Sequence, residues 1–422
     1  MEQLLIYIPE KSHRQTYVFN FVFRGVLGID YQETGDFSFF SNSQLPKLMY
    51  SDERLNVEGI YIKNNGFLYE KGMCKTNCDF TIGCKSDAPF TIQNTDVFAA
   101  TFFLITRYEE YFATEKDQYQ RFSGKQSVAY QYGFLKRPIV DEWAFSILEE
   151  LLKKYPSLSY KKRSYQFIPT LDIDMPYYYR SEGIFRRILK KAKKLIEGEF
   201  KYIFRDPYDV YEQVKKWDVQ FQINTIYFLL MGNKHQFDNP HHKNKQPLRA
   251  LIKTLALSNR VGVHPSYYSN NHTSQIATEK NELENYLGKK VELSRQHYLK
   301  LTFPDTYRSL LANGIKEDYT MIYADEPGFR ASTCTPFYWY DLENDKVTDL
   351  KIYPTAVMDQ TLKRYQQLNR EEALKEVWNL IENVRKVNGT LITLWHNESV
   401  SDFGGWKGWK NMYIQMLEMA TP

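Results

Sequence analysis

From about residue 163 to residue 397 the chain alternates between short apolar runs and longer stretches of helical spacing. The runs with the length and composition of strands are RSYQFIPTLDID at 163–174, NTIYFLLM at 224–231, RVGVHPS at 260–266, KVELSRQHY at 290–298, DYTMIYADE at 318–326 and GTLITLWHN at 389–397. Helical spacing falls between them at 247–257, 276–288, 304–313 and 370–386. Strands that alternate with helices predict a parallel sheet, and at this length a barrel.

Residues 1 to about 160 show a different pattern, in which short apolar or alternating runs come first and helical stretches follow. The Asn-Asn-Gly sequence at 64–66 is a hairpin signal. The mixture predicts an α+β accessory domain over residues 1–160, with the barrel over residues 161–422.

The first helical stretch of this region, at 95–113, is apolar over most of its surface, and Asp96 is placed to cap it. A helix of this kind does not stand in water alone. We therefore expect it to pack against the barrel or a second subunit and to help wall the cleft. The second helical stretch falls at 140–154 and ends in a basic turn.

Composition narrows the class of protein. The net charge of +4 over 422 residues is too small to indicate a nucleic-acid partner. No run of about 18 apolar residues is present, and the first 25 residues lack the pattern of a signal peptide, so we expect no transmembrane segment and a cytoplasmic location. CKTNC at 74–78 has no second cysteine pair, which favours reduced cysteines over a metal or a disulfide. The basic run at 186–201 is typical of a solvated amphipathic helix, with contact to a membrane surface or a lipid-linked substrate as the alternative.

Two carboxylates end the first strand of the alternating region. Asp172 and Asp174 lie two residues apart, so they should project from the same side of the strand's carboxyl end. Like charges this close repel each other unless a cation or a proton lies between them. The usual resolution is that one carboxylate binds a metal while the other transfers protons. For this pair alone, an Asp-rich turn without chemistry is the simpler alternative.

Three histidines also stand at predicted strand ends: His264, His297 and His396. Active residues of parallel barrels gather at the carboxyl ends of the strands. A single histidine at such a position is more often a hydrogen-bonded loop residue. Three of them on the face that also carries Asp172 and Asp174 predict a shared site.

The pattern TxDxD at 170–174 resembles the first motif of the polysaccharide deacetylase family, also called NodB-homology or carbohydrate esterase family 4. The resemblance covers about residues 165 to 400. The segments FAATFFLITRYEEY and GFLKRPIVDEWAF resemble the N-terminal region that accompanies a bacterial deacetylase-like subgroup. Membership would imply an α/β fold with a distorted, seven-stranded (β/α) barrel.

The resemblance also implies a metal site. In the family, the second aspartate and two histidines of an HS/TxxH motif bind zinc or a similar divalent ion. Here Asp174 and His264 match, whereas Tyr268 stands in place of the second histidine. His297 is the best candidate for the missing ligand, and His272 is a weaker one. Tyr268 is a poor ligand at neutral pH and is expected to contact substrate instead.

The remaining roles follow from the later family motifs. Asp172 would accept a proton from water while Arg295 holds it by opposite charge. His396, in LITLWHN, would protonate the leaving amine. Further residues expected to contact substrate are Arg330, Trp339 and Trp395, and Asp325 is a loose match to the fourth motif.

The function implied is metal-assisted removal of an N-acetyl or related acyl group from a carbohydrate, such as a nucleotide-linked, lipid-linked or small sugar precursor. Two alternatives stay open. The first is a metal-free hydrolase acting on another C–N bond, because the second motif is incomplete. The second is a barrel that binds carbohydrate without catalysis.

Overall fold

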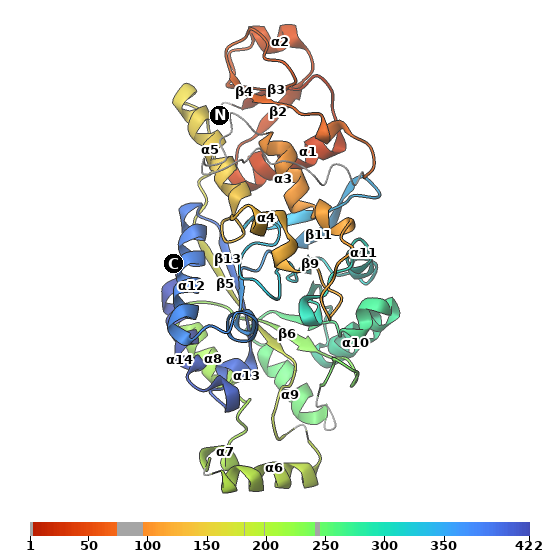
Figure 1. Ribbon diagram of the computed structural model, residues 1–422, viewed down its shortest axis with the longest axis vertical. Helices are drawn as coiled ribbons and strands as arrows, with labels where there is room; N and C mark the ends of the chain where they lie inside the picture. Colours follow the sequence, from red (N-terminus) through yellow and green to blue (C-terminus); the bar gives the residue numbers. More distant parts are fainter. Residues whose placement is uncertain (1–2, 74–95, 181, 198, 241–244) are drawn as a thin grey trace.

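The computed structural model describes residues 3–73, 96–180, 182–197, 199–240 and 245–422, so the CKTNC segment lies outside the described residues. Two sheets organise the described part of the chain (Figure 1). The smaller sheet has four strands in the order β2-β1-β3-β4, and the larger has nine in the order β10-β11-β9-β8-β7-β6-β5-β13-β12. Helices lie against both, which confirms the α/β class.

The smaller sheet is formed by β1 (Leu4–Tyr7), β2 (Tyr31–Thr34), β3 (Lys47–Ser51) and β4 (Ile60–Lys63). The helices and helical turns of the same region are α1 (His13–Phe19), η1 (Asn20–Leu27), α2 (Phe37–Asn42), η2 (Phe67–Tyr69), α3 (Val97–Ile105), η4 (Tyr108–Tyr111), η5 (Gly124–Gln126), α4 (Val128–Gln131) and α5 (Ile139–Lys154).

The larger sheet is formed by β5 (Gln166–Ile173), β6 (Ile226–Leu230), β7 (Val261–His264), β8 (Leu293–Ser294), β9 (Glu317–Asp318), β10 (Phe337–Asp341), β11 (Lys346–Ile352), β12 (Val357–Met358) and β13 (Thr390–His396). Its helices and helical turns are α6 (Ile184–Ile196), α7 (Lys201–Phe204), α8 (Tyr211–Phe221), α9 (Lys245–Leu255), η6 (Tyr268–Asn271), α10 (Thr273–Leu287), η7 (His297–Leu299), α11 (Asp305–Ala312), η8 (Thr361–Tyr365), α12 (Arg370–Lys386), α13 (Asn397–Val400), η9 (Gly404–Trp406) and α14 (Trp409–Ala420).

The pairing of the smaller sheet corrects two predictions. Every strand pair in it is parallel, so this region is α/β and not α+β. The Asn-Asn-Gly sequence does not form a hairpin. It follows β4, and the side chains of Asn64 and Asn65 accept hydrogen bonds from the backbone of Gly66 and Phe67, which starts η2. The asparagines thus make turns of their own instead of joining two strands.

In the larger sheet, seven consecutive neighbours, β9-β8-β7-β6-β5-β13-β12, are parallel. The hairpin β10–β11 continues the sheet beyond β9. No strand pairing within the described residues joins the edge strands β10 and β12, so a closed barrel is not established by the pairing. The strands at 290–298 and 318–326 are also shorter than predicted, because most of these residues are irregular or belong to η7.

The sheet wraps around one buried side chain, Arg295, which follows β8. Its guanidinium donates to Thr170 Oγ1 on β5 at 2.6 Å, to the carbonyl of Tyr319 at 3.0 Å and to Thr355 Oγ1 at 3.3 Å. Thr170 lies on β5, three strands away from β8 in the sheet, while Tyr319 follows β9 and Thr355 precedes β12. A single arginine can reach all of them only because the sheet is strongly curved.

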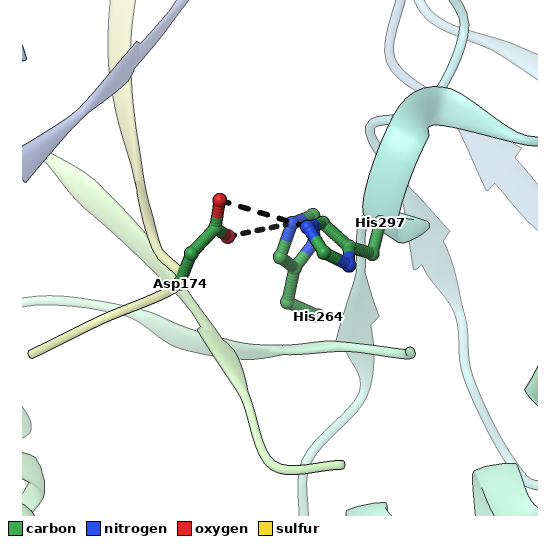
Figure 2. A group of neighbouring side chains, drawn as sticks. All are labelled: Asp174, His264 and His297. Carbon is green, nitrogen blue, oxygen red and sulfur yellow. Dashed lines mark ion pairs between the residues drawn. The ribbon is translucent and has the colours of Figure 1, made fainter. Parts of the chain in front are cut away.

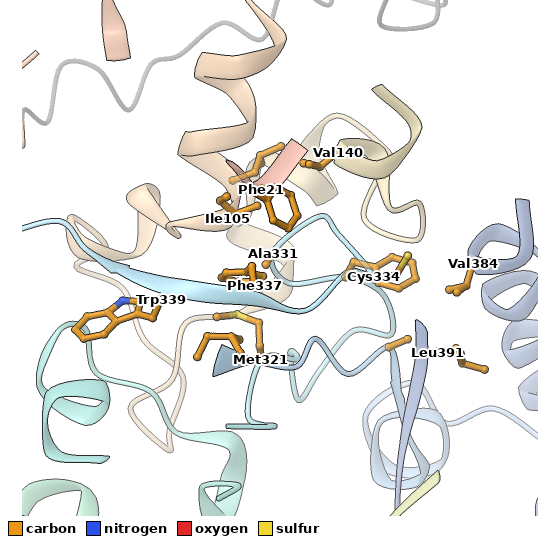
Figure 3. Close-up of a cluster of buried hydrophobic side chains, with 14 of the residues drawn as sticks. Phe21, Ile105, Val140, Met321, Ala331, Cys334, Phe337, Trp339, Val384 and Leu391 are labelled. Atoms are coloured by element: carbon orange, nitrogen blue, oxygen red, sulfur yellow. The ribbon is translucent and has the colours of Figure 1, made fainter. Parts of the chain in front are cut away.

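The two sheets share one hydrophobic core (Figure 3). Asp96 caps α3 by accepting from the backbone of Ala99 at 2.9 Å, and every residue of that helix is buried. Its Phe102 ring packs 5.2 Å from the Tyr340 ring on β10, and Phe21 packs 6.1 Å from Phe337. The prediction that this helix packs against the second part of the chain is therefore confirmed. Among the described residues, the helices are all too short or too polar to cross a bilayer.

Candidate active site

The aspartates and histidines picked out from the sequence meet at the carboxyl ends of the parallel strands. Strand pairing sets His396, the last residue of β13, beside Asp172 of β5, and His264, the last residue of β7, beside Leu230 of β6. Asp174 follows β5, and His297 opens η7 after β8. All five side chains line one pocket of about 380 Å³. The structure therefore brings these five residues together.

Asp174, His264 and His297 form the part of the site that suits a metal ion (Figure 2). Nε2 of His264 lies 3.3 Å from Asp174 Oδ1, and Nε2 of His297 lies 3.6 Å from Asp174 Oδ2. One ligand atom from each residue falls within 4.8 Å of the others. Asp174 Oδ1 is buried and makes no hydrogen bond. A buried carboxylate oxygen without a donor is costly, and a cation between these three groups would satisfy it.

The imidazoles of His264 and His297 are each oriented by a hydrogen bond at Nδ1, the ring nitrogen that points away from Asp174. Nδ1 of His264 lies 2.5 Å from the carbonyl oxygen of Arg295, and Nδ1 of His297 lies 2.7 Å from Asp238 Oδ1. An acceptor at Nδ1 requires a proton there, which leaves Nε2 of the neutral ring free to bind a ligand. Metal-binding histidines are usually oriented in this way. Asp238 is itself fixed, since it accepts from the backbone of Tyr267 and Tyr268 at 2.7 and 3.0 Å.

The charges of this group favour one another. Burial alone would raise the pKa of Asp174, but the charge of His297 and the nearby imidazoles outweigh it and hold that pKa well below its usual value. Burial would lower the pKa of His297, yet Asp174 and Asp238 raise it to about 9. At neutral pH His297 therefore carries a proton that a metal ion must displace.

Asp172 has different surroundings from Asp174, although the two are separated by only one residue. Its Oδ1 accepts from Arg295 Nη1 at 2.8 Å, and its Oδ2 lies 3.6 Å from Nε2 of His264. Asp172 and Arg295 are both buried. Asp172 thus has a fixed cation partner, while Asp174 faces three imidazoles, those of His264, His297 and His396.

His396 closes the opposite side of the site. Its Nδ1 lies 2.8 Å from Asp359 Oδ1, and its Nε2 lies 3.9 Å from Asp174 Oδ2. Burial would lower the pKa of His396, but Asp359 first, and then Asp174 and Asp172, raise it to about 10. The ring is therefore protonated at neutral pH and can donate from Nε2 into the pocket.

The N-terminal region supplies one wall of the pocket through Gln118, Tyr119 and Arg121. Arg121 donates to the carbonyl of Tyr298 and to the hydroxyl of Tyr365, both at 2.9 Å. Three residues further on, the backbone of Gly124 donates to Asp325 Oδ1 at 3.0 Å. Asp325, the loose match to the fourth motif, thus holds the wall segment in place. The predicted wall exists, but it comes from the segment after α3 and not from the helix itself.

The four residues expected to contact substrate do not line this pocket. Arg330 is buried against Glu110, where its Nε donates at 2.9 Å. Trp339 packs on Tyr307, and Trp395 packs on Tyr413, with both indoles fully buried. Tyr268 stacks on His272 instead of facing the pocket. The prediction is wrong for Arg330, Trp339 and Trp395, because these side chains are buried in contacts inside the protein and do not reach the pocket.

Sequence reasoning missed Asp238 and assigned no role to Asp359. These two carboxylates orient His297 and His396, from 59 and 37 residues away in the chain. Asp359 ends an apolar segment, AVMD, which was a usable signal. Asp238 lies in a polar loop, and nothing in its neighbourhood marks it.

Comparison by sequence gives one match, over the N-terminal region. Residues 4–156 match the model of a family of unknown function, DUF7033. Among curated proteins, no significant match to this chain was found.

Comparison by structure finds similarity to polysaccharide deacetylases over about three fifths of the chain. A candidate polysaccharide deacetylase from Mycobacterium smegmatis is 11% identical, with a TM-score of 0.40, over 62% of this chain and 85% of that one. A polysaccharide deacetylase from Bacillus cereus is 12% identical, with a TM-score of 0.31, over 61% and 86%. A CE4-family pseudoenzyme from Bacillus anthracis is 9% identical, with a TM-score of 0.29, over 61% and 62%. All three TM-scores are below 0.5, so the superpositions are loose.

Proposed function

We propose that this protein is a metal-dependent hydrolase that removes an N-acetyl or related acyl group from a carbohydrate. The observation that carries the proposal is the convergence of three ligand atoms within 4.8 Å of one another, between a carboxylate held by arginine and an imidazole held by aspartate. Such a set provides a metal site, a proton acceptor and a proton donor within one pocket.

Asp174, His264 and His297 are the proposed metal ligands, and zinc is the proposed ion. One carboxylate and two imidazoles, with room left for a further ligand, are a common donor set of catalytic zinc. His297 takes the place that Tyr268 leaves open. When bound, such an ion lowers the pKa of a coordinated water and polarises a carbonyl group.

Asp172 and His396 are the proposed acid–base pair, with Arg295 as a positioning residue. Asp172 would accept the proton of the attacking water while Arg295 Nη1 holds its other oxygen at 2.8 Å. His396, protonated and fixed by Asp359, would give its Nε2 proton to the nitrogen of the leaving amine. An amine leaves far more readily than its anion, so this proton transfer is needed for an amide substrate.

The walls of the pocket suit a sugar ring. Tyr119, Tyr298 and Tyr365 offer aromatic faces, against which the C–H faces of a sugar can pack. Gln296, Gln360 and Glu398 offer hydrogen-bonding groups among them. We propose that residues 161–422 form a distorted barrel that carries the chemistry, and that residues 1–160 form an accessory domain that completes the cleft.

The test measures metal content and turnover on the same purified full-length chain. Elemental analysis should find about one zinc ion per chain, as in single-site zinc hydrolases. Acetate release from N-acetylglucosamine oligosaccharides should fall by about 10²–10⁴-fold in Asp172→Asn, with the metal retained, because a general base is lost and a ligand is not. Asp349→Asn, on the exposed side of β11, is the matched control and should change neither quantity.

Two outcomes would replace the proposal. Turnover by a chain that carries no metal would indicate a metal-free hydrolase. Binding of the oligosaccharides without acetate release, from a chain loaded with zinc, would indicate a carbohydrate-binding protein.

A further inference from the structure

Helix α6 presents an apolar surface to solvent. Its large apolar side chains recur at the spacing of one helix face, and none is buried: the exposed fractions are 69% for Ile184, 81% for Phe185, 59% for Ile188, 69% for Leu189, 52% for Leu195 and 86% for Ile196. Exposed apolar groups scattered singly are ordinary, but a continuous row of this kind marks a binding surface. We call these six side chains the apolar row.

The basic side of the same helix faces the protein. Lys190 Nζ donates to Glu182 at 2.8 Å and to the carbonyl of Tyr178 at 3.1 Å. Lys194 Nζ lies 4.6 Å from the centre of the Phe403 ring. A surface helix of a globular protein normally turns its apolar side inward. In α6 this arrangement is inverted, so the fold keeps the apolar row outside instead of burying it.

The inverted helix is held firmly in place. Asp206 is buried and accepts from four backbone N–H groups, those of Tyr178, Tyr179, Arg180 and Tyr208, at 2.7–3.1 Å. These bonds join the segment that leads to α6 with the one that returns from α7. The attachment begins directly after Asp174, because Asn397 Nδ2 donates to the carbonyl of Met175 at 2.9 Å. Figure 1 shows α6 and α7 at the end of the molecule opposite the smaller sheet.

Cations flank the apolar row. Arg186, Arg187 and Lys193 are exposed, and helical spacing places them along the two borders of the row. We propose that α6 docks on the surface of an anionic lipid bilayer, with the apolar row inserted at the level of the headgroups and the flanking cations bound to lipid phosphates. Phe200, which precedes α7, and Phe204, its last residue, are 60% and 91% exposed and add apolar surface after α6.

The charges beside the apolar row favour an anionic bilayer over a second copy of the chain as its binding partner. Two α6 helices packed through their apolar rows would bring the same flanking cations together, and like charges at that distance repel. An anionic surface has the complementary charge, and its phosphates can be reached by arginine and lysine side chains that extend along an apolar surface.

The experiment is flotation of the full-length protein with vesicles, with and without the apolar row. Vesicles of phosphatidylcholine with phosphatidylglycerol should carry the wild-type protein upward, and vesicles of phosphatidylcholine alone should carry much less. Ile188→Asn/Leu189→Asn should reduce the bound fraction by about tenfold or more, because two aliphatic side chains leave the bilayer. The matched control is Val219→Asn/Leu257→Asn, which alters side chains that are 74% and 85% exposed elsewhere and should leave binding unchanged.

Two further measurements decide the remaining possibilities. Arg186→Glu/Arg187→Glu should weaken binding to the anionic vesicles, as should added salt. A circular-dichroism melt of each variant checks that it is folded, and zinc content checks that the pocket is unchanged, so the outcome does not depend on the proposed hydrolase activity. Failure of the wild-type protein to float, or equal flotation of Ile188→Asn/Leu189→Asn, overturns the proposal. So does a wild-type dimer in sedimentation experiments that Ile188→Asn/Leu189→Asn converts to a monomer, because a second copy would then cover the row.

Discussion

The molecule contains two buried groups of charged residues that differ in how their charges are matched. The interface cluster, Arg107, Glu109, Glu110 and Arg330, lies between the N-terminal region and the larger sheet. Glu110 accepts from Arg107 Nε and Arg330 Nε, each at 2.9 Å, and Arg107 Nη2 donates to Glu109 at 2.6 Å. Every member has a partner of opposite charge at hydrogen-bonding distance. Burial would raise the pKa of Glu110, but the two arginines outweigh it and lower that pKa.

The site cluster consists of Asp172, Asp174, His264, His297 and His396. Its imidazoles have close hydrogen-bond partners at one ring nitrogen only. Each imidazole is hydrogen-bonded at Nδ1, while the Nε2 atoms lie 3.3 to 3.9 Å from Asp174. The interface cluster satisfies its charges internally, so the loss of one member would leave a buried charge without its partner. The site cluster leaves polar atoms facing one another across a pocket, and only a ligand can complete it.

The largest effect expected from breaking this contrast is in His264→Ala. Removing one of three ligands should abolish metal binding, because the two that remain make a weak site. Zinc content of the purified variant measures it, with His272→Ala as the control, since that exposed ring stacks on Tyr268 outside the pocket. A His264→Ala protein that keeps its zinc would show that the three residues do not share an ion.

The next effect concerns the proton donor. His396→Ala should slow amide hydrolysis by about 10²–10⁴-fold and hydrolysis of an activated ester by much less, because a good leaving group needs little protonation. Rates on both substrates with the same zinc-loaded protein measure the difference. If both rates fell equally, His396 would belong with the structural residues.

Breaking the interface cluster should affect stability and leave the site intact. Glu110→Ala leaves two buried guanidinium groups without their shared acceptor and should lower the free energy of unfolding by about 3–5 kcal/mol. Urea unfolding followed by tryptophan fluorescence measures it, with the exposed Glu115→Ala as control. Zinc affinity of the folded variant should be unchanged. A loss of zinc binding as large as that of His264→Ala would mean that the two clusters act as one.

A smaller effect is expected from removing the carboxylate of Asp238, which orients His297 but does not itself line the pocket. Asp238→Asn should weaken zinc binding by about 10–100-fold, because His297 loses the carboxylate that orients it and increases its basicity. The measurement uses a competing chelator above pH 9, where a proton no longer competes for His297 in the wild-type protein. An unchanged affinity there would remove Asp238 from the site.

The last prediction concerns the dependence of metal affinity on pH, which changes the affinity by a modest factor over each pH unit. His297 has a pKa of about 9 without metal, so below that pH its proton must leave before Nε2 can bind. The apparent affinity for zinc should rise by about tenfold per pH unit up to about pH 9 and then level off. Asp174 adds nothing to this slope, because its pKa lies well below the range. A flat profile would show that His297 is not a ligand.

Local pattern predicted the strands that are apolar along their length. The predicted runs contain β5, β6, β7 and β13, and the helix at 370–386 has the predicted bounds. The hairpin β10–β11, formed by FYWYD and KVTDLKI, is not among the predicted runs. The edges of that sheet are set by tertiary pairing, and so is the parallel order of the smaller sheet, which no local turn signal reveals.

The site was predictable to the extent that it lies on strand ends. Asp172, Asp174, His264 and His396 end strands or follow them directly, and parallel strands end at one edge. The roles of Asp238 and Asp359 could not be predicted, because each depends on a contact with a histidine that is distant in the sequence, His297 and His396 respectively. Arg330, Trp339 and Trp395 were misassigned because the same residue types serve a buried core and a sugar site, and only burial distinguishes the two.

Arg295 couples the folding of the larger sheet to the formation of the site, because the same guanidinium bonds both to the sheet and to Asp172. Its guanidinium is fully buried, and its partners lie on segments that are far apart in the chain. A partly formed sheet that lacked any of these segments would leave a buried charge without an acceptor, which costs several kcal/mol. Folding intermediates with an open sheet are therefore penalised by the residue that holds Asp172. We therefore expect this region of the chain to fold with high cooperativity. Whenever the sheet is folded, Arg295 is in place and holds the carboxylate of Asp172, the proposed proton acceptor, in position.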